Sequence, residues 1–392
     1  MGSSKRWFIT LWSIIVVLLA IDGALMIRHQ VVHHGPRTSQ RSKGKGSAQP
    51  TASRLYGYTQ SAAANQLLVA KLKPMAFSGA AIIVQNGHVV GQYSHGMAND
   101  GKGVKNSPNV SYEIDSVQKN LTAALVMRVI RSGKLSFNSH LSDFYPQIPG
   151  SQDITIRQML DMTSGLSAPD SLHTPNKDMS DAEVVQSAIE SLKYNAMQHG
   201  KWSYQPVNFT LLAGIIERVT RKSYADLFMQ TIARPLGLKG THMADATLTG
   251  QSSAQGYNTS SPEDYSKPYK MLKGQIQSEL GTGQIFMTPG DLYRIESSLL
   301  NGKLLSAGES QALYGPRDSV MYSGGYYHDG TNYLYANGYG YGFEAFVRIT
   351  PDGKNAVVVM CNKTLPYDQI KAAIDGVVQW WLVQKHDGDV IQ

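Results

Sequence analysis

Two β-hairpin patterns stand at opposite ends of the folded part of the sequence, and they constrain the fold more than any other feature. Ser78–Gln85 and His88–Tyr93 are apolar runs joined by an Asn-Gly pair, whose residues both tolerate the positive φ of a tight turn. Glu344–Thr350 and Ala356–Cys361 flank a Pro-Asp-Gly turn in the same way. We therefore expect one antiparallel sheet built from the two ends of the domain.

Helical patterns fill most of the chain outside these hairpins. A periodic segment at Tyr58–Leu72 precedes the first hairpin, and an amphipathic segment at Gln369–Gln384 follows the last. Ser116–Leu300 is mostly helical in pattern, with loop-rich insertions near Ser167–Ser180 and Thr247–Lys267. This order predicts an α+β fold in which helices flank the sheet and a helical subdomain is inserted between its strands.

The N-terminal region predicts a membrane anchor. After a short tail at 1–6, residues 7–27 are almost entirely apolar, and roughly 20 such residues cross a hydrocarbon core as a helix. A cleaved signal peptide is the alternative, but Asp22 stands where a small residue would precede a cut after Ala24. Residues 28–55 are basic and rich in Gly, Ser and His, which predicts a flexible stalk before a folded domain at 56–392.

The topology rests on two opposing signals. Basic residues after the apolar segment outnumber those before it, and this alone would keep the C-terminal side in the cytoplasm. Long C-terminal domains, however, translocate largely regardless of flanking charge. Because the chemistry described below belongs outside the cell, we expect a single-pass cell-membrane protein with an extracellular domain. An exported chain with a single cysteine is typical of Gram-positive bacteria.

The charge distribution limits the classes of partner. The formal net charge is +7, but much of it lies in the segment 28–45, and no run of basic and aromatic residues resembles a nucleic-acid-binding module. An acidic envelope polymer or a lipid surface is the expected partner. Cys361 is the single cysteine, which excludes a disulfide framework and a multi-thiolate metal site. Histidines such as His242 and His328 have no metal-ligand spacing with carboxylates or thiols, and neither a metal nor a cofactor is predicted.

A Ser-x-x-Lys pattern opens one of the predicted helices. Ser116 would sit in the first turn, where free backbone N–H groups can stabilise an oxyanion, and Lys119 would lie one turn on along the same face. A buried lysine of lowered pKa can then take the serine proton. The pattern alone is weak, because an N-cap serine followed by a solvated lysine gives the same letters.

A series of further segments follows this pattern in a fixed order. They are Gly133–Ser136, Leu141–Pro146, Ile154–Leu160, Thr163–Leu166, Leu211–Glu217, Pro235–Leu238, Thr288–Leu292 and Leu299–Leu305. The series resembles the serine β-lactamase, penicillin-binding protein and class C-like esterase family over roughly Ser78–Val383. The resemblance implies a β-lactamase/transpeptidase-like fold, in which Ser116 is acylated and Lys119 assists proton transfer.

The family's second element is a Tyr-x-Asn triad, and Tyr204-Gln205-Pro206 stands at its place. The resemblance implies that Tyr204 acts as general base or general acid. Pro206 occupies the asparagine position and offers no side-chain amide to the substrate. Asn208, two residues on, is the candidate substitute.

The family's third element, Lys-Thr-Gly or His-x-Gly, should precede Gly342, but Tyr335–Tyr341 contains no cation. Asn337 and Gly338 are the substrate-binding candidates there, and Arg348 could supply a cation or face solvent. A charge-assisted hydrogen bond contributes roughly 1.5–3 kcal/mol, so its loss disfavours peptides that end in a free carboxylate. The abundance of Tyr and Gly in Tyr322–Tyr341 also suits a groove that binds sugars or polyols.

These features favour a hydrolase of D-alanyl groups in the cell envelope, with D-alanyl esters of (lipo)teichoic acid ahead of amides. Within the same class, a D,D-carboxypeptidase, a short-chain esterase and a β-lactamase are the alternatives, and the β-lactamase ranks lowest because both altered elements would help it. From another class, the chain could be a non-catalytic module that binds peptidoglycan or teichoic acid. Ser116, Lys119 and Tyr204 together argue against that module, which has no chemical need for all three.

Overall fold

The computed structural model describes residues 60–169, 177–244, 253–259, 261, 263–316, 321–328 and 332–384. The predicted anchor at 7–27 and stalk at 28–55 lie outside these residues. Within the described ranges, no helix is both long enough and apolar enough to cross a membrane. The described residues all fall within one compact unit, and the elements below belong to it.

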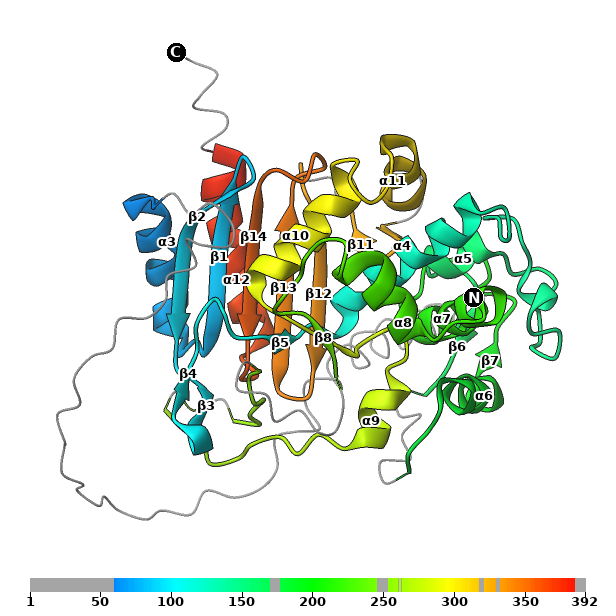
Figure 1. Ribbon diagram of the computed structural model, residues 1–392, viewed down its shortest axis with the longest axis horizontal. Helices are drawn as coiled ribbons and strands as arrows, with labels where there is room; N and C mark the ends of the chain where they lie inside the picture. Colours follow the sequence, from blue (N-terminus) through cyan, green and yellow to red (C-terminus); the bar gives the residue numbers. More distant parts are fainter. Residues whose placement is uncertain are drawn as a thin grey trace, which may run out of the picture. The chain divides into compact units, whose positions relative to one another are not determined.

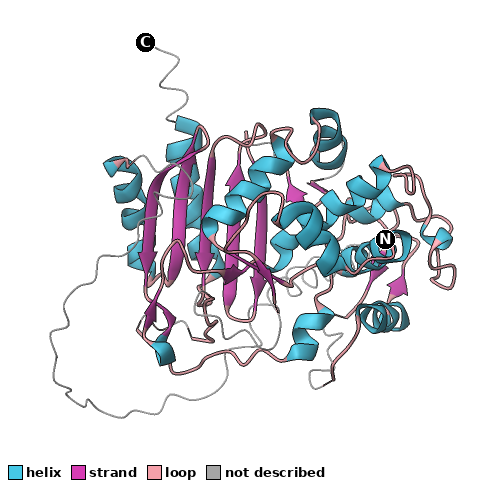
Figure 2. Cartoon of the chain, viewed as in Figure 1, coloured by secondary structure: helices cyan, strands magenta, loops and turns pink. Residues whose placement is uncertain are grey.

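A large antiparallel sheet organises the described part of the chain, with seven strands in the order β10-β11-β12-β13-β14-β1-β2 (Figures 1 and 2). Strand β1 pairs antiparallel with β14, so the first and last hairpins meet side by side, as the sequence predicted. The seven strands are β1 (Gly79–Gln85), β2 (His88–His95), β10 (Tyr322–Ser323), β11 (Tyr326–Tyr327), β12 (Leu334–Gly340), β13 (Phe343–Ile349) and β14 (Ala356–Cys361).

The first hairpin turns where the Asn-Gly pair predicted it. Asn86 has φ 50° and Gly87 has φ 81°, and positive φ at both central residues is the signature of a two-residue hairpin turn whose twist matches that of its strands. The turn connects β1 directly to β2. The hairpin prediction is confirmed at this end of the sheet.

Helices cover both faces of the sheet. They are α3 (Ala62–Leu72) and α12 (Tyr367–Val378) on one face and α10 (Pro289–Leu300) on the other (Figure 1). Alternate residues of β14 divide between the two layers, because Val358 packs in the cluster that includes α10 and Val357 packs in the cluster that includes α3 and α12. A strand buried on both faces needs a continuous apolar run, and β14 has one.

The region between the hairpins is helical but also holds short strands that the sequence pattern did not predict. Strands β5, β9 and β8 form a small sheet, β6 pairs with β7, and β3 pairs with β4. Two-residue strands leave no period in a sequence, so their pairing depends on tertiary contacts.

The remaining elements are β3 (Met97–Asn99), β4 (Val104–Lys105), β5 (Tyr112–Glu113), the 3-10 turn η3 (Asp115–Val117), α4 (Gln118–Arg131), α5 (Ile156–Leu160), β6 (Leu166–Ser167), α6 (Asp181–Ser191), β7 (Lys193–Tyr194), α7 (Val207–Thr220), α8 (Tyr224–Phe228), the π-helical turn η5 (Met229–Ala233), β8 (His242–Met243), α9 (Lys273–Ser278), β9 (Ile285–Met287), α11 (Ala307–Tyr314) and the π-helical turn η6 (Gln379–Gln384). The α+β class is confirmed. The predicted C-terminal helix is also confirmed as α12 followed by η6.

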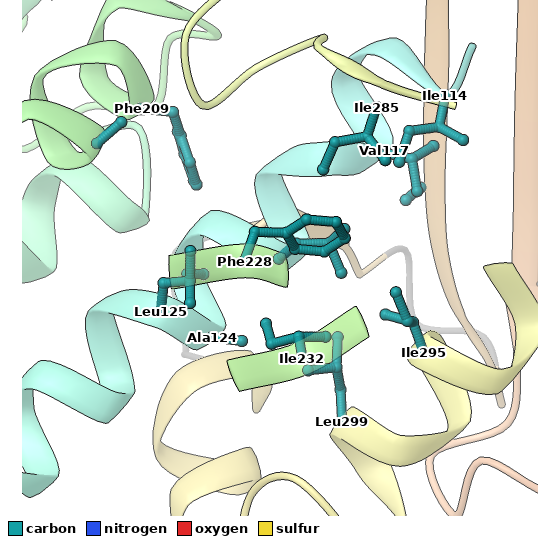
Figure 3. Packing of buried hydrophobic residues seen from close by; sticks show 14 of the residues in the cluster. Ile114, Val117, Ala124, Leu125, Phe209, Phe228, Ile232, Ile285, Ile295 and Leu299 are labelled. Atoms are coloured by element: carbon teal, nitrogen blue, oxygen red, sulfur yellow. The ribbon is translucent and has the colours of Figure 1, made fainter. Parts of the chain in front are cut away.

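Helix α4 runs through the core. Its first ten residues, 118 to 127, are all buried. Figure 3 shows Ala124 and Leu125 of this helix among Phe228, Ile295 and other apolar side chains from α8 and α10. Because packing at this density holds side chains and backbone in one arrangement, the start of α4 offers a fixed platform for the residues in the turn that precedes it.

Candidate active site

The turn before α4 carries the candidate nucleophile in an unusual backbone conformation. Asp115, directly before Ser116, has φ 43°, and its N–H donates to Glu113 Oε1 at 2.7 Å. A left-handed residue that is not glycine is uncommon and costs free energy, so it persists only where its surroundings hold it. Here the Glu113 carboxylate supports the turn that leads from β5 to Ser116.

Lys119 and Ser116 are in direct contact. Lys119 Nζ donates to Ser116 Oγ at 2.7 Å, and Ser116 Oγ donates to Asp115 Oδ1 at 3.1 Å. Burial of the 0% exposed Lys119 lowers its pKa to about 8, although the neighbouring carboxylates of Asp115, Glu279 and Glu113 oppose the shift. The structure thus brings the two predicted residues together, with an amine that is partly neutral near physiological pH.

Tyr204 lies close to both Ser116 and Lys119. Lys119 Nζ is 5.2 Å from the centroid of its ring, and the ring stacks on Tyr327 at 6.4 Å between centroids. Burial raises the pKa of Tyr204 well above its usual range, and a hydrogen bond with Ser116 offsets only part of that rise. The sequence left open whether Tyr204 acts as a general base or as a general acid. Its raised pKa suits the phenol to donate a proton rather than to accept one.

An acidic cavity of about 320 Å³ opens beside the nucleophile. Ser116, Lys119, Asp115 and Glu279 line it, and among the described lining residues Lys119 is the one basic side chain. Burial, together with the charge of Glu279, raises the pKa of Asp115 to about 7. Within the described ranges, no group of three His, Cys, Asp or Glu side chains is placed to hold a metal ion.

The position of Glu279 is fixed by its neighbours. Its carboxylate accepts from Tyr341 Oη at 3.2 Å and from Thr282 Oγ1 at 2.8 Å. Sequence reasoning did not identify Asp115 or Glu279 as residues of the site. Asp115 was visible next to the serine, whereas Glu279 lies far along the chain in a segment without a motif.

The glycines of β12 let this strand lie against the nucleophile's turn. A Cβ added to Gly338 would lie 2.1 Å from the Ile114 carbonyl oxygen, and one added to Gly340 would lie 1.9 Å from Asp115 Oδ2. Any larger residue would push the strand away. The predicted residue Gly338 is therefore part of the site because it permits this close approach.

Asn337 lies on β12 and lines a second cavity, of about 240 Å³. Its Oδ1 accepts from Arg348 Nη1 at 2.8 Å. Arg348 is 1% exposed, and its guanidinium lies 4.8 Å from the Tyr335 ring centroid and 3.9 Å from the Asp375 carboxylate. Arg348 thus faces neither solvent nor the cavities, and its charge acts from behind Asn337.

Asn208 does not reach either cavity, contrary to its candidacy as a substrate-binding residue. It is 1% exposed, its Oδ1 accepts from Ser164 Oγ at 2.7 Å, and its Nδ2 donates to the Gln205 carbonyl oxygen at 3.0 Å. The amide is used inside the protein because Asn208 lies on the inner face of α7. Gln205 and Pro206 line the acidic cavity instead, and Gln205 is a side-chain amide that sequence reasoning passed over.

Comparison with known proteins places this arrangement among characterised families. The family model described as "Beta-lactamase" matches residues 66–377. PbpX of Bacillus subtilis (strain 168) is 28% identical over 301 residues, which cover 76% of this chain and 74% of that protein. The teichoic acid D-alanine hydrolase of Staphylococcus aureus (strain MRSA252) is 28% identical over 236 residues, which cover 60% of this chain and 57% of that protein.

Solved structures show the same fold. FmtA from Staphylococcus aureus matches with a TM-score of 0.69 and 25% identity, covering 81% of this chain and 86% of that one. The D-amino acid amidase from Ochrobactrum anthropi SV3 matches with a TM-score of 0.67 and 15% identity, covering 81% of this chain and 97% of that one. At the latter identity the likeness concerns the fold alone.

Proposed function

The chain belongs to the beta-lactamase family of serine hydrolases and has the β-lactamase/transpeptidase-like fold, and we propose that it hydrolyses D-alanyl esters of (lipo)teichoic acid. The observation that carries the proposal is the acidic cavity beside Ser116, which Asp115 and Glu279 line. A D-alanyl ester presents a free ammonium group there, whereas the corresponding alanine of a muropeptide is N-acylated and neutral. The name of the staphylococcal relative supports this substrate.

The proposed reaction divides proton transfer between two residues. Neutral Lys119 takes the proton of Ser116 as Oγ attacks the ester carbonyl, and Tyr204 gives its proton to the departing alcohol oxygen. Lys119 then returns a proton to Tyr204. The backbone N–H of Ser116 and one from β12 stabilise the oxyanion, and water releases D-alanine by the reverse sequence of transfers.

The leaving group is where an ester of this type differs from a peptide. A D-Ala-D-Ala peptide releases an amino acid with a free carboxylate, which a cation at the third motif would bind. Arg348 stands behind Asn337 and is already engaged, so no cationic side chain among the described residues lines either cavity at that strand. An uncharged alcohol would make no charge-assisted hydrogen bond to such a cation, so its absence does not weaken binding of the alcohol.

The cellular setting stays a prediction. We propose that residues 7–27 anchor the domain at the outer face of the membrane, where teichoic acid is within reach. Labelling of the domain on intact cells with a reagent that does not cross membranes tests this topology, and a domain labelled only after lysis would contradict it.

Two envelope substrates separate the proposed reaction from its alternative. The soluble part of the protein is incubated with D-alanylated teichoic acid or with a muropeptide ending in D-Ala-D-Ala, and free D-alanine is quantified. We expect release from the teichoic acid alone. Release from the muropeptide alone would instead identify a carboxypeptidase, and silence on both would favour a different ester or the binding module.

Replacement of Glu279 by Gln tests the acidic cavity directly. We expect the KM for a D-alanyl ester to rise roughly ten- to a hundredfold, because a charge-assisted bond to the ammonium is lost. The KM and kcat for an acetyl ester, which has no ammonium, should not worsen, because loss of this carboxylate also lowers the pKa of Lys119 further. Steady-state kinetics on both esters test whether Glu279 binds the ammonium group, and Glu190→Gln makes the same change at an exposed position as a control. Equal effects of Glu279→Gln on the two esters would contradict this role.

A further inference from the structure

The second cavity shares the nucleophile with the acidic cavity but has a different chemical character. Its lining consists of Ser116, Tyr204, Asn337, Gly338, Tyr339, Glu344, Phe346 and Tyr367. Lys119, Asp115 and Glu279 line only the acidic cavity, whereas Tyr204 lines only this one. The two cavities thus meet at Ser116, one on the Lys119 side and the other on the Tyr204 side.

Glu344 is the unexplained group of this cavity. It lies on β13, directly opposite Tyr339 on β12 and Cys361 on β14, and it is 1% exposed. Neither carboxylate oxygen makes a hydrogen bond of ordinary geometry. A buried polar group without such bonds costs free energy, and a hydroxyl bound in the cavity would offset that cost.

The proton on Glu344 decides what it can bind. Burial raises its pKa to about 8, and the backbone of Leu365 offsets only part of the rise. Near neutral pH the group is largely a carboxylic acid, which donates one hydrogen bond and accepts others. Such a group suits hydroxyls, which both donate and accept.

The rest of the lining fits the same chemistry. Because Asn337 Oδ1 is held by Arg348, its Nδ2 points the other way, donating to Tyr367 Oη at 3.3 Å and keeping a second N–H for a ligand. Phe346 provides an apolar wall suited to carbon-bound hydrogens. Uncharged donors and acceptors around an aromatic wall are what a short polyhydroxylated chain requires.

We propose that this cavity is the subsite for the alcohol half of the ester, a polyol such as a glycerol or ribitol unit, and that Glu344 and Asn337 hydrogen-bond its hydroxyls. Tyr204 fixes the assignment, because the residue that protonates the leaving oxygen must lie on the side of the alcohol. The inference rests on the proposed function and extends it by making Glu344 a specificity-determining residue.

Acyl transfer to glycerol tests the subsite with a simple probe. p-Nitrophenyl acetate acylates Ser116 and releases p-nitrophenol, after which water or glycerol attacks the acetyl carbon. In the transfer, a glycerol C–O–acetyl bond forms, the acetyl–Oγ bond breaks, and the glycerol proton passes through Tyr204 and Lys119 to Ser116. By microscopic reversibility, the acceptor alcohol occupies the subsite of the leaving alcohol.

The measured quantity is the ratio of glycerol acetate to free acetate. We expect Glu344→Leu to lower the ratio about tenfold, since one hydrogen bond to glycerol is lost and a donor is left unpaired. Glu344→Gln still donates and accepts, so it should stay within about twofold of the unmodified protein. Free acetate and glycerol acetate arise from the same acyl-enzyme, so their ratio does not depend on how fast either variant is acylated.

A second variant and the controls keep the test decisive. Asn337→Ala should lower the same ratio, and thermal unfolding reports whether each variant folds; we expect Glu344→Leu to melt no lower, because a buried acid is removed. A Glu344→Leu protein that keeps the transfer ratio, or an unmodified protein that transfers nothing to glycerol, overturns the subsite. Failure to cleave D-alanylated teichoic acid while acetyl transfer proceeds overturns only the proposed natural substrate.

Discussion

Replacement of Ser116 by Ala is expected to lower D-alanine release from D-alanylated teichoic acid by at least about three orders of magnitude, because the acyl-enzyme can no longer form. Lys119 Nζ would lose its hydrogen-bonding partner at 2.7 Å, and both cavities would keep their other lining residues. Binding of the polymer should therefore survive. Released D-alanine and polymer retention are measured on the same preparation.

Mass spectrometry gives this prediction an independent readout. Acid quenching during turnover should trap an alanyl group on Ser116 in the unmodified protein and none in the Ser116→Ala variant. A non-catalytic binding module predicts no adduct in either protein and equal binding in both. A variant that still releases D-alanine at a tenth of the original rate would show that another residue is the nucleophile.

The structure removes the simplest alternative interpretation of the Ser-x-x-Lys pattern. A serine that merely caps a helix would occupy the N-cap position, but Val117 holds that position in α4 and Ser116 lies in the turn before it. A solvated lysine would be exposed, whereas Lys119 is 0% exposed. The burial that lowers the lysine pKa is a property of the packed core, and a four-residue sequence pattern does not show it.

Local patterns account for what could be predicted. The hairpin that joins β1 to β2 depends on two turn residues and on alternating strands, both of which are readable in a short window. Glu279 and Glu344 are distant from Ser116 in the sequence, and only tertiary folding brings them to the site; neither belongs to a motif. Asn208 shows the opposite limit: it stands close to the motif in the sequence, but the helix that carries it turns its amide inward.

Under the proposed function, the two cavities account for the missing cation at the family's third element. Acidic groups on the Lys119 side suit a cationic acyl group, and uncharged donors on the Tyr204 side suit a neutral alcohol. A substrate with a carboxylate leaving group would find no cationic side chain in the second cavity, because Arg348 lies behind Asn337. We therefore expect this charge pattern to favour an aminoacyl ester over a carboxylated peptide.

Replacement of Lys119 by Arg is expected to lower kcat/KM on the order of 10² to 10⁴-fold, although the charge and much of the length are kept. A base must be neutral to accept the serine proton. With a pKa of about 8, roughly 10% of Lys119 is neutral at pH 7, compared with about 0.03% at the ordinary pKa, whereas arginine stays protonated. The loss of activity should thus follow from the higher pKa of arginine, because the positive charge itself is kept.

The pH profile checks this reasoning on the unmodified protein, because a lowered lysine pKa places the gain of activity at a defined pH. For an acetyl ester, kcat/KM should rise through about pH 8, as Lys119 loses its proton, and then level off. For a D-alanyl ester it should pass through a maximum, because the substrate's own ammonium, with a pKa of about 8, loses its charge and its attraction to Asp115 and Glu279. Two further variants serve as controls. Lys193→Arg makes the same change at an exposed position, and thermal unfolding of Lys119→Met shows whether the site still folds once the buried charge is removed. A Lys119→Arg protein with more than a tenth of the original activity, or the same flat pH profile for both esters, would mean that another group takes the serine proton.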